Sequence, residues 1–115
     1  METTISSGAT AESQAVDLLV RRGYRIVERN YRCTIGELDI VARDRGVLVF
    51  VEVRSRANSE HGHALEMVGR RKQRKVTRVA QSYLAWRRPL FDEARFDVVA
   101  ITGSEIVLVQ DAWRL

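Results

Sequence analysis

Two of the acidic residues in one stretch of the sequence, Asp39 and Glu52, stand within runs that otherwise read as buried β-strand. The stretch "GELDIVARDRGVLVFVEVRSR", residues 36–56, places Asp39 in a first apolar run and Glu52 in a second. A carboxylate inside a sheet is costly to bury unless a proton, a basic side chain or a metal ion accompanies it. These carboxylates are therefore the first candidates for chemistry in this chain.

The spacing of the acids predicts that they lie close together. The segment "RDRG" between the two runs supplies the Asp and Gly of a tight hairpin turn. Asp39 and Glu52 are about equally far from that turn, so we expect them to be cross-strand neighbours on one face. A shared proton or a cation relieves the repulsion between two such carboxylates. We expect a divalent cation, Mg²⁺ or Mn²⁺, to which the backbone carbonyl of Val53 could add a third oxygen.

A divalent ion at this place would suit phosphodiester hydrolysis. It can acidify a water molecule for attack and stabilise charge on the leaving oxygen. Arg54 shares the face of Glu52, and its guanidinium stays protonated, so its expected task is to hold the attacking water or to offset charge on the phosphate. The alternative is a pair of solvent-facing acids that form salt bridges with a basic neighbour: Arg43, Arg54 or Arg56.

Positive charge is concentrated in one short run, "RRKQRKVTR", residues 70–78. The whole chain has a net charge of +4, and the chain without this run is net negative. Such a local cluster is typical of a surface that binds nucleic acid, and with Arg56 it is expected to contact phosphates without reading bases. The alternative is a solvated helix face. The cationic residues of the run are Arg70, Arg71, Lys72, Arg74, Lys75 and Arg78.

The elements that must position these residues follow from the periodicity of the apolar side chains. Helical spacing predicts two helices, and alternation predicts strands joined by Gly-containing turns. The order is α-β-β-β-α-β-β, which predicts an α/β fold with a mixed sheet and helices on both faces. In chain order we expect a helix at 11–22, a strand at 24–31, a hairpin at 38–54, a loop at 55–69, a helix at 70–87 and a hairpin at 95–110.

Length and composition predict one globular domain. The chain has 115 residues, of which 45% are hydrophobic and 30% charged. Residues 1–10 are polar and are expected to form a flexible tail before a single domain at 11–115. No run approaches the ~20 apolar residues of a membrane span, and no secretory signal is present, so no membrane partner is expected. The sole cysteine, Cys33, fits a reducing cytoplasm and argues against a zinc cluster.

The motif "GELDIVARD…VLVFVEVRSR" resembles the catalytic core of the restriction-endonuclease-like nucleases, which carry a PD-(D/E)xK motif. Most of the chain, from the helix of Glu12 through "GYRIVERNYR" to "RKQRKVTRVAQSYL" and "RFDVVAI", resembles the YraN-like family of small bacterial proteins, related to archaeal Holliday-junction resolvases. The resemblance implies a three-layer nuclease fold, metal binding by Asp39 and Glu52, and Arg54 at the position of the motif's lysine. It also matches Glu12 to an acid of the first helix. Helical spacing places Glu12 on or beside the buried stripe, although an ordinary acid near a helix N-terminus is equally consistent.

These features together predict a Mg²⁺- or Mn²⁺-dependent DNA endonuclease that acts on branched or damaged DNA. Its expected metal ligands are Asp39, Glu52 and Glu12. The alternative is a nucleic-acid-binding module that keeps the fold without turnover, which is consistent with Arg54 at the lysine position. A third hypothesis is a protein-interaction domain. The resolvases that the family resembles act as dimers because a junction offers two symmetric strands, so a homodimer is a further expectation.

Overall fold

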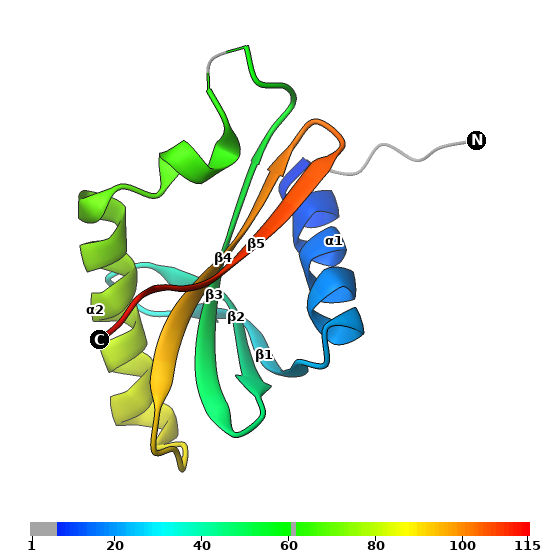
Figure 1. The fold of residues 1–115 in the computed structure, drawn as a ribbon. Coiled ribbons are helices and arrows are strands. Elements are labelled where there is room, and N and C mark those ends of the chain that lie inside the picture. Colours follow the sequence, from blue (N-terminus) through cyan, green and yellow to red (C-terminus); the bar gives the residue numbers. More distant parts are fainter. Residues whose placement is uncertain (1–6, 61) are drawn as a thin grey trace.

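Alternating apolar residues form a mixed five-stranded sheet, and two amphipathic helices cover its two faces (Figure 1). The computed structural model describes residues 7–60 and 62–115. The predicted fold class and element order are confirmed, with one short 3-10 helix added. The elements are α1 Ser7–Arg21, β1 Arg25–Arg32, β2 Glu37–Asp44, β3 Val47–Arg56, η1 Ala64–Met67, α2 Arg70–Arg87, β4 Ala94–Thr102 and β5 Glu105–Trp113.

The two helices differ in how well the sequence predicts their ends. Helix α2 spans the predicted residues, but α1 begins at Ser7 and so includes residues 7–10, which the sequence assigned to a tail. No proline stands there to stop the helix. The rest of the predicted tail, residues 1–6, lies outside the described residues. Among the described residues, no helix has the length and hydropathy to cross a membrane.

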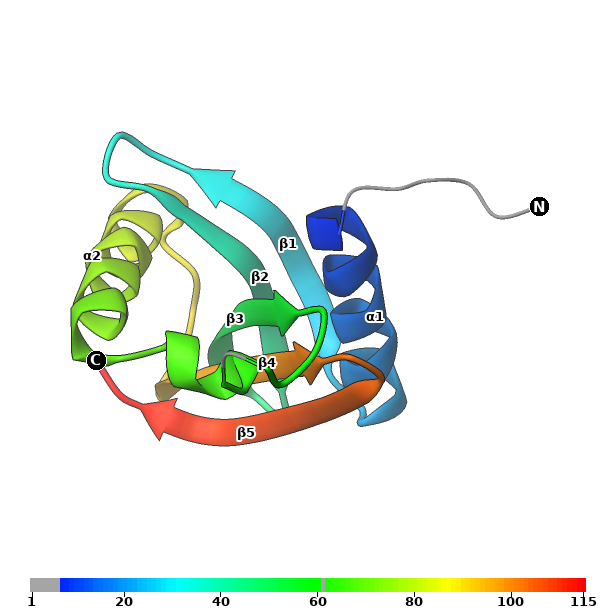
Figure 2. The same cartoon turned by 90° about the horizontal axis from the view of Figure 1, so that it is seen from above.

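The sheet has the order β1-β2-β3-β4-β5, in which only β3 and β4 run parallel. Parallel neighbours need a crossover connection, and α2 provides it on one face of the sheet while α1 packs on the other (Figure 2). The central strand β3 is covered on both faces. Its residues Leu48 and Phe50 join the α2 cluster, and Val49 and Val51 join the α1 cluster, as period-2 alternation predicts.

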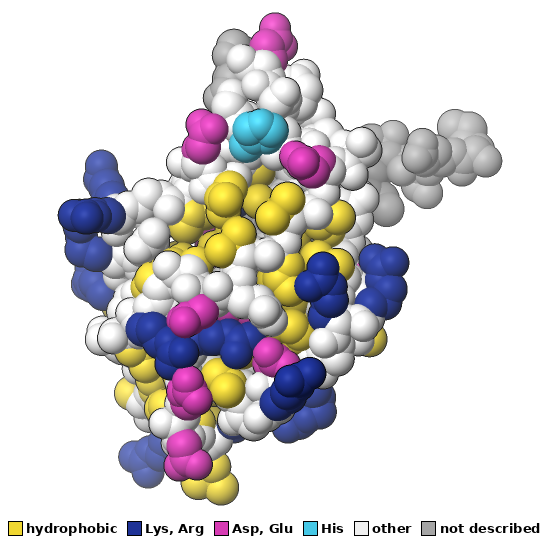
Figure 3. Space-filling view, in the orientation of Figure 1, with side chains coloured by type: hydrophobic (Ala, Val, Ile, Leu, Met, Phe, Trp, Pro, Cys, Tyr) yellow, Lys and Arg dark blue, Asp and Glu magenta, His cyan; other side chains and the backbone are white. Residues whose placement is uncertain are grey.

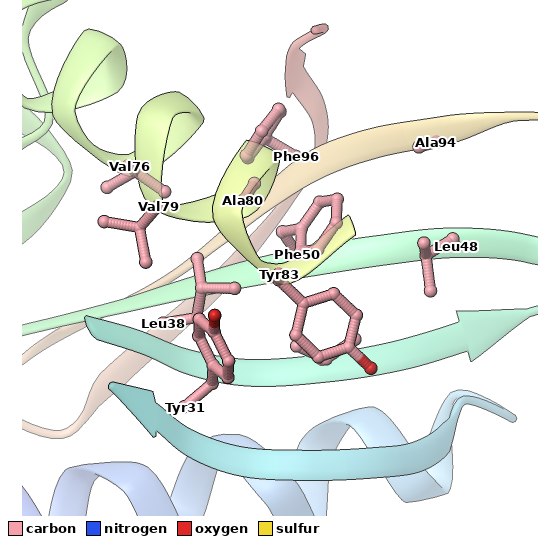
Figure 4. Close-up of a cluster of buried hydrophobic side chains, with 11 residues drawn as sticks. Tyr31, Leu38, Leu48, Phe50, Val76, Val79, Ala80, Tyr83, Ala94 and Phe96 are labelled. Atoms are coloured by element: carbon pink, nitrogen blue, oxygen red, sulfur yellow. The ribbon is translucent and has the colours of Figure 1, made fainter. Parts of the chain in front are cut away.

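Aromatic rings fill the layer between α2 and the sheet (Figure 4). The ring of Phe50 lies 5.8 Å from that of Tyr83 on α2 and 5.2 Å from that of Phe96 on β4. Val76 and Val79 add the aliphatic part of the predicted helical stripe, and both are buried. Burying each such side chain contributes about 1.5–3 kcal/mol, so this layer fixes the position of α2 on the sheet.

A second polar feature lies inside the sheet, away from the predicted acids. Asp97 is fully buried and accepts hydrogen bonds from the Tyr24 hydroxyl at 2.6 Å, from Arg95 Nε at 2.9 Å and from the Asp111 N–H at 2.8 Å. Arg95 also forms an ion pair with Asp44 at 2.7 Å. We call Tyr24, Asp44, Arg95 and Asp97 the Asp97 network. Its buried carboxylate is matched by a cation and by hydrogen-bond donors, as a buried charge requires.

Candidate active site

The β2–β3 hairpin brings Asp39 and Glu52 together. Its ladder pairs Ile40 with Val51, so the two acids occupy the next pair of positions. At this end of the ladder a side chain takes the place of a backbone acceptor. Asp39 Oδ2 accepts a hydrogen bond from the Val53 N–H at 2.8 Å. Glu52 is only 3% exposed. The predicted neighbourhood of the two carboxylates is therefore present, and one of them is tied to the backbone of the opposite strand.

Burial and mutual repulsion act on this carboxyl pair. Burial, followed by the negative charge of Asp39, raises the pKa of Glu52 to about 7, although Arg54 and Lys72 oppose the shift. Burial likewise raises the pKa of Asp39, against the opposing effects of the Val53 N–H and Arg54. Near neutral pH the pair therefore favours holding a proton. A site that holds a proton between two oxygens is one where a cation can replace it.

Two basic side chains already contact Glu52. Arg54 forms an ion pair with it along β3, as the salt-bridge alternative anticipated, but Glu52 is buried rather than solvent-facing. Lys72 Nζ lies 3.6 Å from Glu52 Oε2. Lys72 comes from α2, and the sequence assigned it only to phosphate contact. Its spacing of four and seven residues from the buried Val76 and Val79 places it toward the sheet, and that signal could have revealed its position.

Asp39 lies between two cavities. On the α2 side, a cavity of about 210 Å³ is lined by both acids together with Arg54, Lys72 and Lys75. On the α1 side, a cavity of about 530 Å³ is lined by Asp39 and Arg54, and also by Glu12 and Val53. Asp39 and Arg54 are thus accessible from both sides of the sheet's edge.

The structure places Glu12 in one cavity with Asp39 but not with Glu52. Glu12 accepts hydrogen bonds from Arg29 Nη2 at 3.2 Å and from Asn30 Nδ2 at 3.1 Å. It lines only the α1-side cavity, whereas Glu52 lines the α2-side cavity. Across residues 7–60 and 62–115, no group of three His, Cys, Asp or Glu side chains could hold a metal ion. The acids brought together are Asp39 and Glu52, and these oxygen donors suit Mg²⁺ or Mn²⁺ with water and phosphate as further ligands.

A kink at Asn30 shapes the edge of this site, and sequence reasoning missed it. Asn30 has φ 57° and lies between the pairs Arg29–Ile40 and Tyr31–Leu38, hence opposite Asp39. At this point the alternation of β2 breaks, because Leu38 joins the α2 cluster while Ile40 joins the α1 cluster. Asparagine tolerates the left-handed conformation better than most residues, so an Asn within a strand run was the available signal.

The basic run forms the outer face of α2, along the edge of the molecule where Figure 3 shows Lys and Arg side chains gathered. A groove of about 860 Å³ lies beside this face and is walled by Ile35 of the β1–β2 connection and by Met67. It shares Lys72 and Lys75 with the cavity that contains the acids. Of the six cations, Lys72 is paired with Glu52, and the other five form no ion pair with any described acid. These five are Arg70, Arg71, Arg74, Lys75 and Arg78.

Arg56 was grouped with these cations by the sequence, but it lies on a different element. It ends β3, two residues after Arg54. The Nε atoms of both arginines are buried and have no hydrogen-bond partner among the described residues. Buried donors are usually satisfied, so these two atoms mark places where a bound oxygen would be stabilised.

Comparison with known proteins identifies relatives of the whole chain. The sequence model of the family described as "Uncharacterised protein family UPF0102" matches residues 11–101. A UPF0102 protein of Lachnoclostridium phytofermentans is 47% identical over 107 residues, which cover 92% of this chain and 91% of that protein. One from Syntrophus aciditrophicus is 41% identical over 119 residues, covering 100% and 94%. One from Geobacter metallireducens is 48% identical over 99 residues, covering 86% and 81%.

Proposed function

The chain belongs to the UPF0102 family, the YraN family that its motifs resemble, and from its site we propose that it is a metal-dependent DNA endonuclease. The observation that carries the proposal is the pair Asp39 and Glu52, a half-buried and a buried carboxylate held as cross-strand neighbours in an accessible cavity. Burial of two neighbouring carboxylates is unfavourable without a cation, and functional sites are where such arrangements concentrate.

The donors in the cavity fit Mg²⁺ or Mn²⁺. Asp39 and Glu52 would supply the carboxylate oxygens from the α2-side cavity, and Val53 lines the α1-side cavity together with Asp39 but not with Glu52. When bound, the ion would lower the pKa of a water molecule and stabilise charge on the phosphate. The Val53 N–H holds the Asp39 carboxylate in its orientation, which keeps one oxygen donor in place before any ligand arrives.

The cations around the acids would orient the phosphodiester. Arg54 lines both cavities and has a buried Nε without a partner, so it can donate a hydrogen bond to a phosphate oxygen or to water. Lys72 and Lys75 connect the acid cavity to the basic groove. A sugar-phosphate backbone that follows these positive side chains would pass over the acids.

Cleavage of labelled DNA tests this function. Purified protein is incubated with branched, single-stranded and duplex DNA in Mn²⁺, beside Glu52→Gln and an EDTA control. We expect cutting by the parent that falls by about a hundredfold or more in Glu52→Gln, since a metal ligand is removed. A matched control is Glu93→Gln, an exposed carboxylate paired with Arg114, which should cut as the parent does. Equal cutting by the parent and Glu52→Gln, or none by the parent, would reject the nuclease.

One observation favours a second candidate, a DNA-binding module without turnover. Arg54 and Lys72 both contact Glu52, and they can neutralise it without a metal. Such a module would bind DNA equally well in EDTA and in Mn²⁺ and would leave it intact. The endonuclease instead requires the ion for cleavage, so the response to the chelator separates the two candidates.

The cellular setting follows from the same proposal. Access to DNA and the sole cysteine, Cys33, which has no partner for an internal disulfide, favour the cytoplasm. A homodimer is the arrangement that two symmetric cuts in a branched substrate would need, and the mass of the protein in solution tests it.

A further inference from the structure

We propose that α2 enters the major groove of duplex DNA, so that one sugar-phosphate backbone lies on each side of the helix. The proposal rests on the DNA-binding part of the proposed function and does not depend on cleavage. The acid-side groove is the 860 Å³ groove that includes Arg71, Lys72 and Lys75. The far-side groove, of about 540 Å³, lies on the opposite flank of α2 and includes Arg70 and Trp113.

The two grooves share a ridge. Arg74 and Arg78, one helical turn apart, line both of them. Figure 2 shows the β1–β2 connection on one side of α2 and the C-terminus on the other, so each groove has its own outer wall. Ile35 belongs to the first wall and Trp113 to the second. The helix therefore lies between the acid-side and far-side grooves, and Arg74 and Arg78 stand on its outer surface between them.

The charges of the two grooves predict that they bind the two sugar-phosphate backbones with unequal strength. Arg70, Arg74 and Arg78 have no ion-pair partner among the described acids. On the far side, Arg114 is neutralised by Glu93 at 2.8 Å and by Asp111 at 2.7 Å, so it adds little positive charge. The acid side has more free cations than the far side. One backbone would be bound firmly beside the acids, and the other would be bound more weakly.

The dimensions of a helix fit this arrangement. An α-helix with its side chains is about 10–12 Å across, and the major groove of B-DNA is about 12 Å wide. A single strand has one backbone and can fill only one of the two grooves. Because Lys72 and Lys75 join the acid-side groove to the cavity of Glu52, the backbone on that side is the one presented to the acids. One chain would then nick one strand of the duplex.

Two adjacent arginines provide a matched test. Arg70 lines only the far-side groove, and Arg71 lines only the acid-side groove. Both are exposed, and both stand in the first turn of α2. Arg70→Glu and Arg71→Glu therefore make the same chemical change in nearly the same place, where a glutamate is favourable for the helix. Circular dichroism checks that each variant is folded.

Binding is measured by fluorescence anisotropy in EDTA, with a labelled 20-nucleotide single strand and the same strand in duplex form, at several salt concentrations. We expect Arg71→Glu to weaken binding to both DNAs by about tenfold at low salt. We expect Arg70→Glu to weaken duplex binding by about three- to tenfold while single-strand binding stays within twofold of the parent. For duplex DNA, the slope of the logarithm of the binding constant against the logarithm of the salt concentration should fall in magnitude by about 1 in Arg70→Glu, which corresponds to one lost phosphate contact.

Any other pattern of DNA binding overturns the proposal. Equal losses of single-strand and duplex binding in Arg70→Glu would mean that both grooves follow one strand, with DNA binding itself intact. No effect of Arg70→Glu on the binding of either DNA would mean that the far-side groove does not contact DNA. A parent protein that binds no DNA at low salt would reject both this inference and the proposed function. A parent that binds in the predicted pattern but never cuts would reject only the endonuclease.

Discussion

Two buried acid groups in this molecule have opposite surroundings. Asp97 is fully buried, and its oxygens receive a tyrosine hydroxyl, an arginine and a backbone N–H. Glu52 is nearly as buried, but it faces a second carboxyl, Asp39, and its pKa rises to about 7. The first group is complete without a ligand. In the second group Arg54 and Lys72 offset part of the charge of Glu52, and a proton or a divalent cation would relieve the remaining repulsion between the two carboxyls.

The contrast indicates how a structural acid in a sheet can be distinguished from a candidate functional one. Both groups include an arginine two residues from a glutamate or aspartate on the same strand, as Arg95 precedes Asp97 and Arg54 follows Glu52. What distinguishes them is the number of donors per carboxylate and the presence of a second acid. Stability should therefore depend on the Asp97 network, and ligand binding should depend on the pair. Four experiments test this contrast.

The largest effect is expected from Asp97→Ala. The substitution leaves Asp44 as the only acid paired with Arg95 among the described residues and removes the acceptor of the Tyr24 hydroxyl, so the free energy of unfolding should fall by about 3 kcal/mol or more. Urea denaturation followed by circular dichroism measures the loss. Glu93→Ala, which breaks the exposed pair with Arg114, should cost less than about 1 kcal/mol. Equal losses in the two variants would erase the contrast.

A divalent ion should stabilise the carboxyl pair and leave the Asp97 network unaffected. At a Mn²⁺ concentration of 100 times Kd, the parent should gain about 2.7 kcal/mol of unfolding free energy. Glu52→Gln should gain little, because it lacks one carboxylate. Thermal denaturation with and without Mn²⁺ measures this difference. Tyr24→Phe is the control, since it changes the network and should keep the full Mn²⁺ effect.

The pH dependence should distinguish the pair in the metal-free protein. Folding raises the pKa of Glu52 from its ordinary value of 4.5 to about 7, so the folded state binds more protons than the unfolded state between these values. The contribution of Glu52 is present below about pH 4.5 and is lost as the pH rises to about 7. Glutamine mimics the protonated acid. Glu52→Gln should therefore gain stability relative to the parent by about 1–3 kcal/mol between pH 5 and pH 8, measured by urea denaturation. A constant difference would contradict the shared-proton description.

The smallest effect is expected from Tyr24→Phe. It removes one neutral donor from Asp97 while Arg95 and the Asp111 N–H stay in place, so the loss should be about 1 kcal/mol. Tyr83→Phe is the matched control, because it removes a hydroxyl outside the Asp97 network and keeps the ring that packs against Phe50 in the α2 layer. A loss from Tyr24→Phe as large as that from Asp97→Ala would mean that the hydroxyl, rather than the arginine, secures the network.

The spacing of apolar residues predicted the helices and strands, because helical and alternating periodicity can be read from neighbouring positions in the chain. The stripe of Val76, Val79 and Tyr83 specified α2 with its bounds, and a short turn fixed the register that makes Asp39 and Glu52 neighbours. The family resemblance is confirmed by relatives along the whole chain. The predicted mixed sheet is confirmed, and its parallel pair, β3 and β4, is the one joined by the crossover helix α2.

What the sequence missed depends on contacts between distant segments. Periodicity places Glu12 near the buried stripe of α1, but its pairing with Arg29 and Asn30 depends on the kink in β1. The contact of Lys72 with Glu52 requires the packing of α2 on the sheet. The metal-binding roles, the DNA contacts and the oligomeric state stay predictions.

The crossover through α2 also bears on how the chain reaches its native state. The β2–β3 hairpin is a local structure that closes around a tight turn, so its two acids can meet early in folding. Pairing of β3 with β4 joins residues far apart in sequence and must wait for the intervening helix, and such pairings of high contact order form slowly. The hairpin would then present its carboxylates to solvent before the basic helix docks.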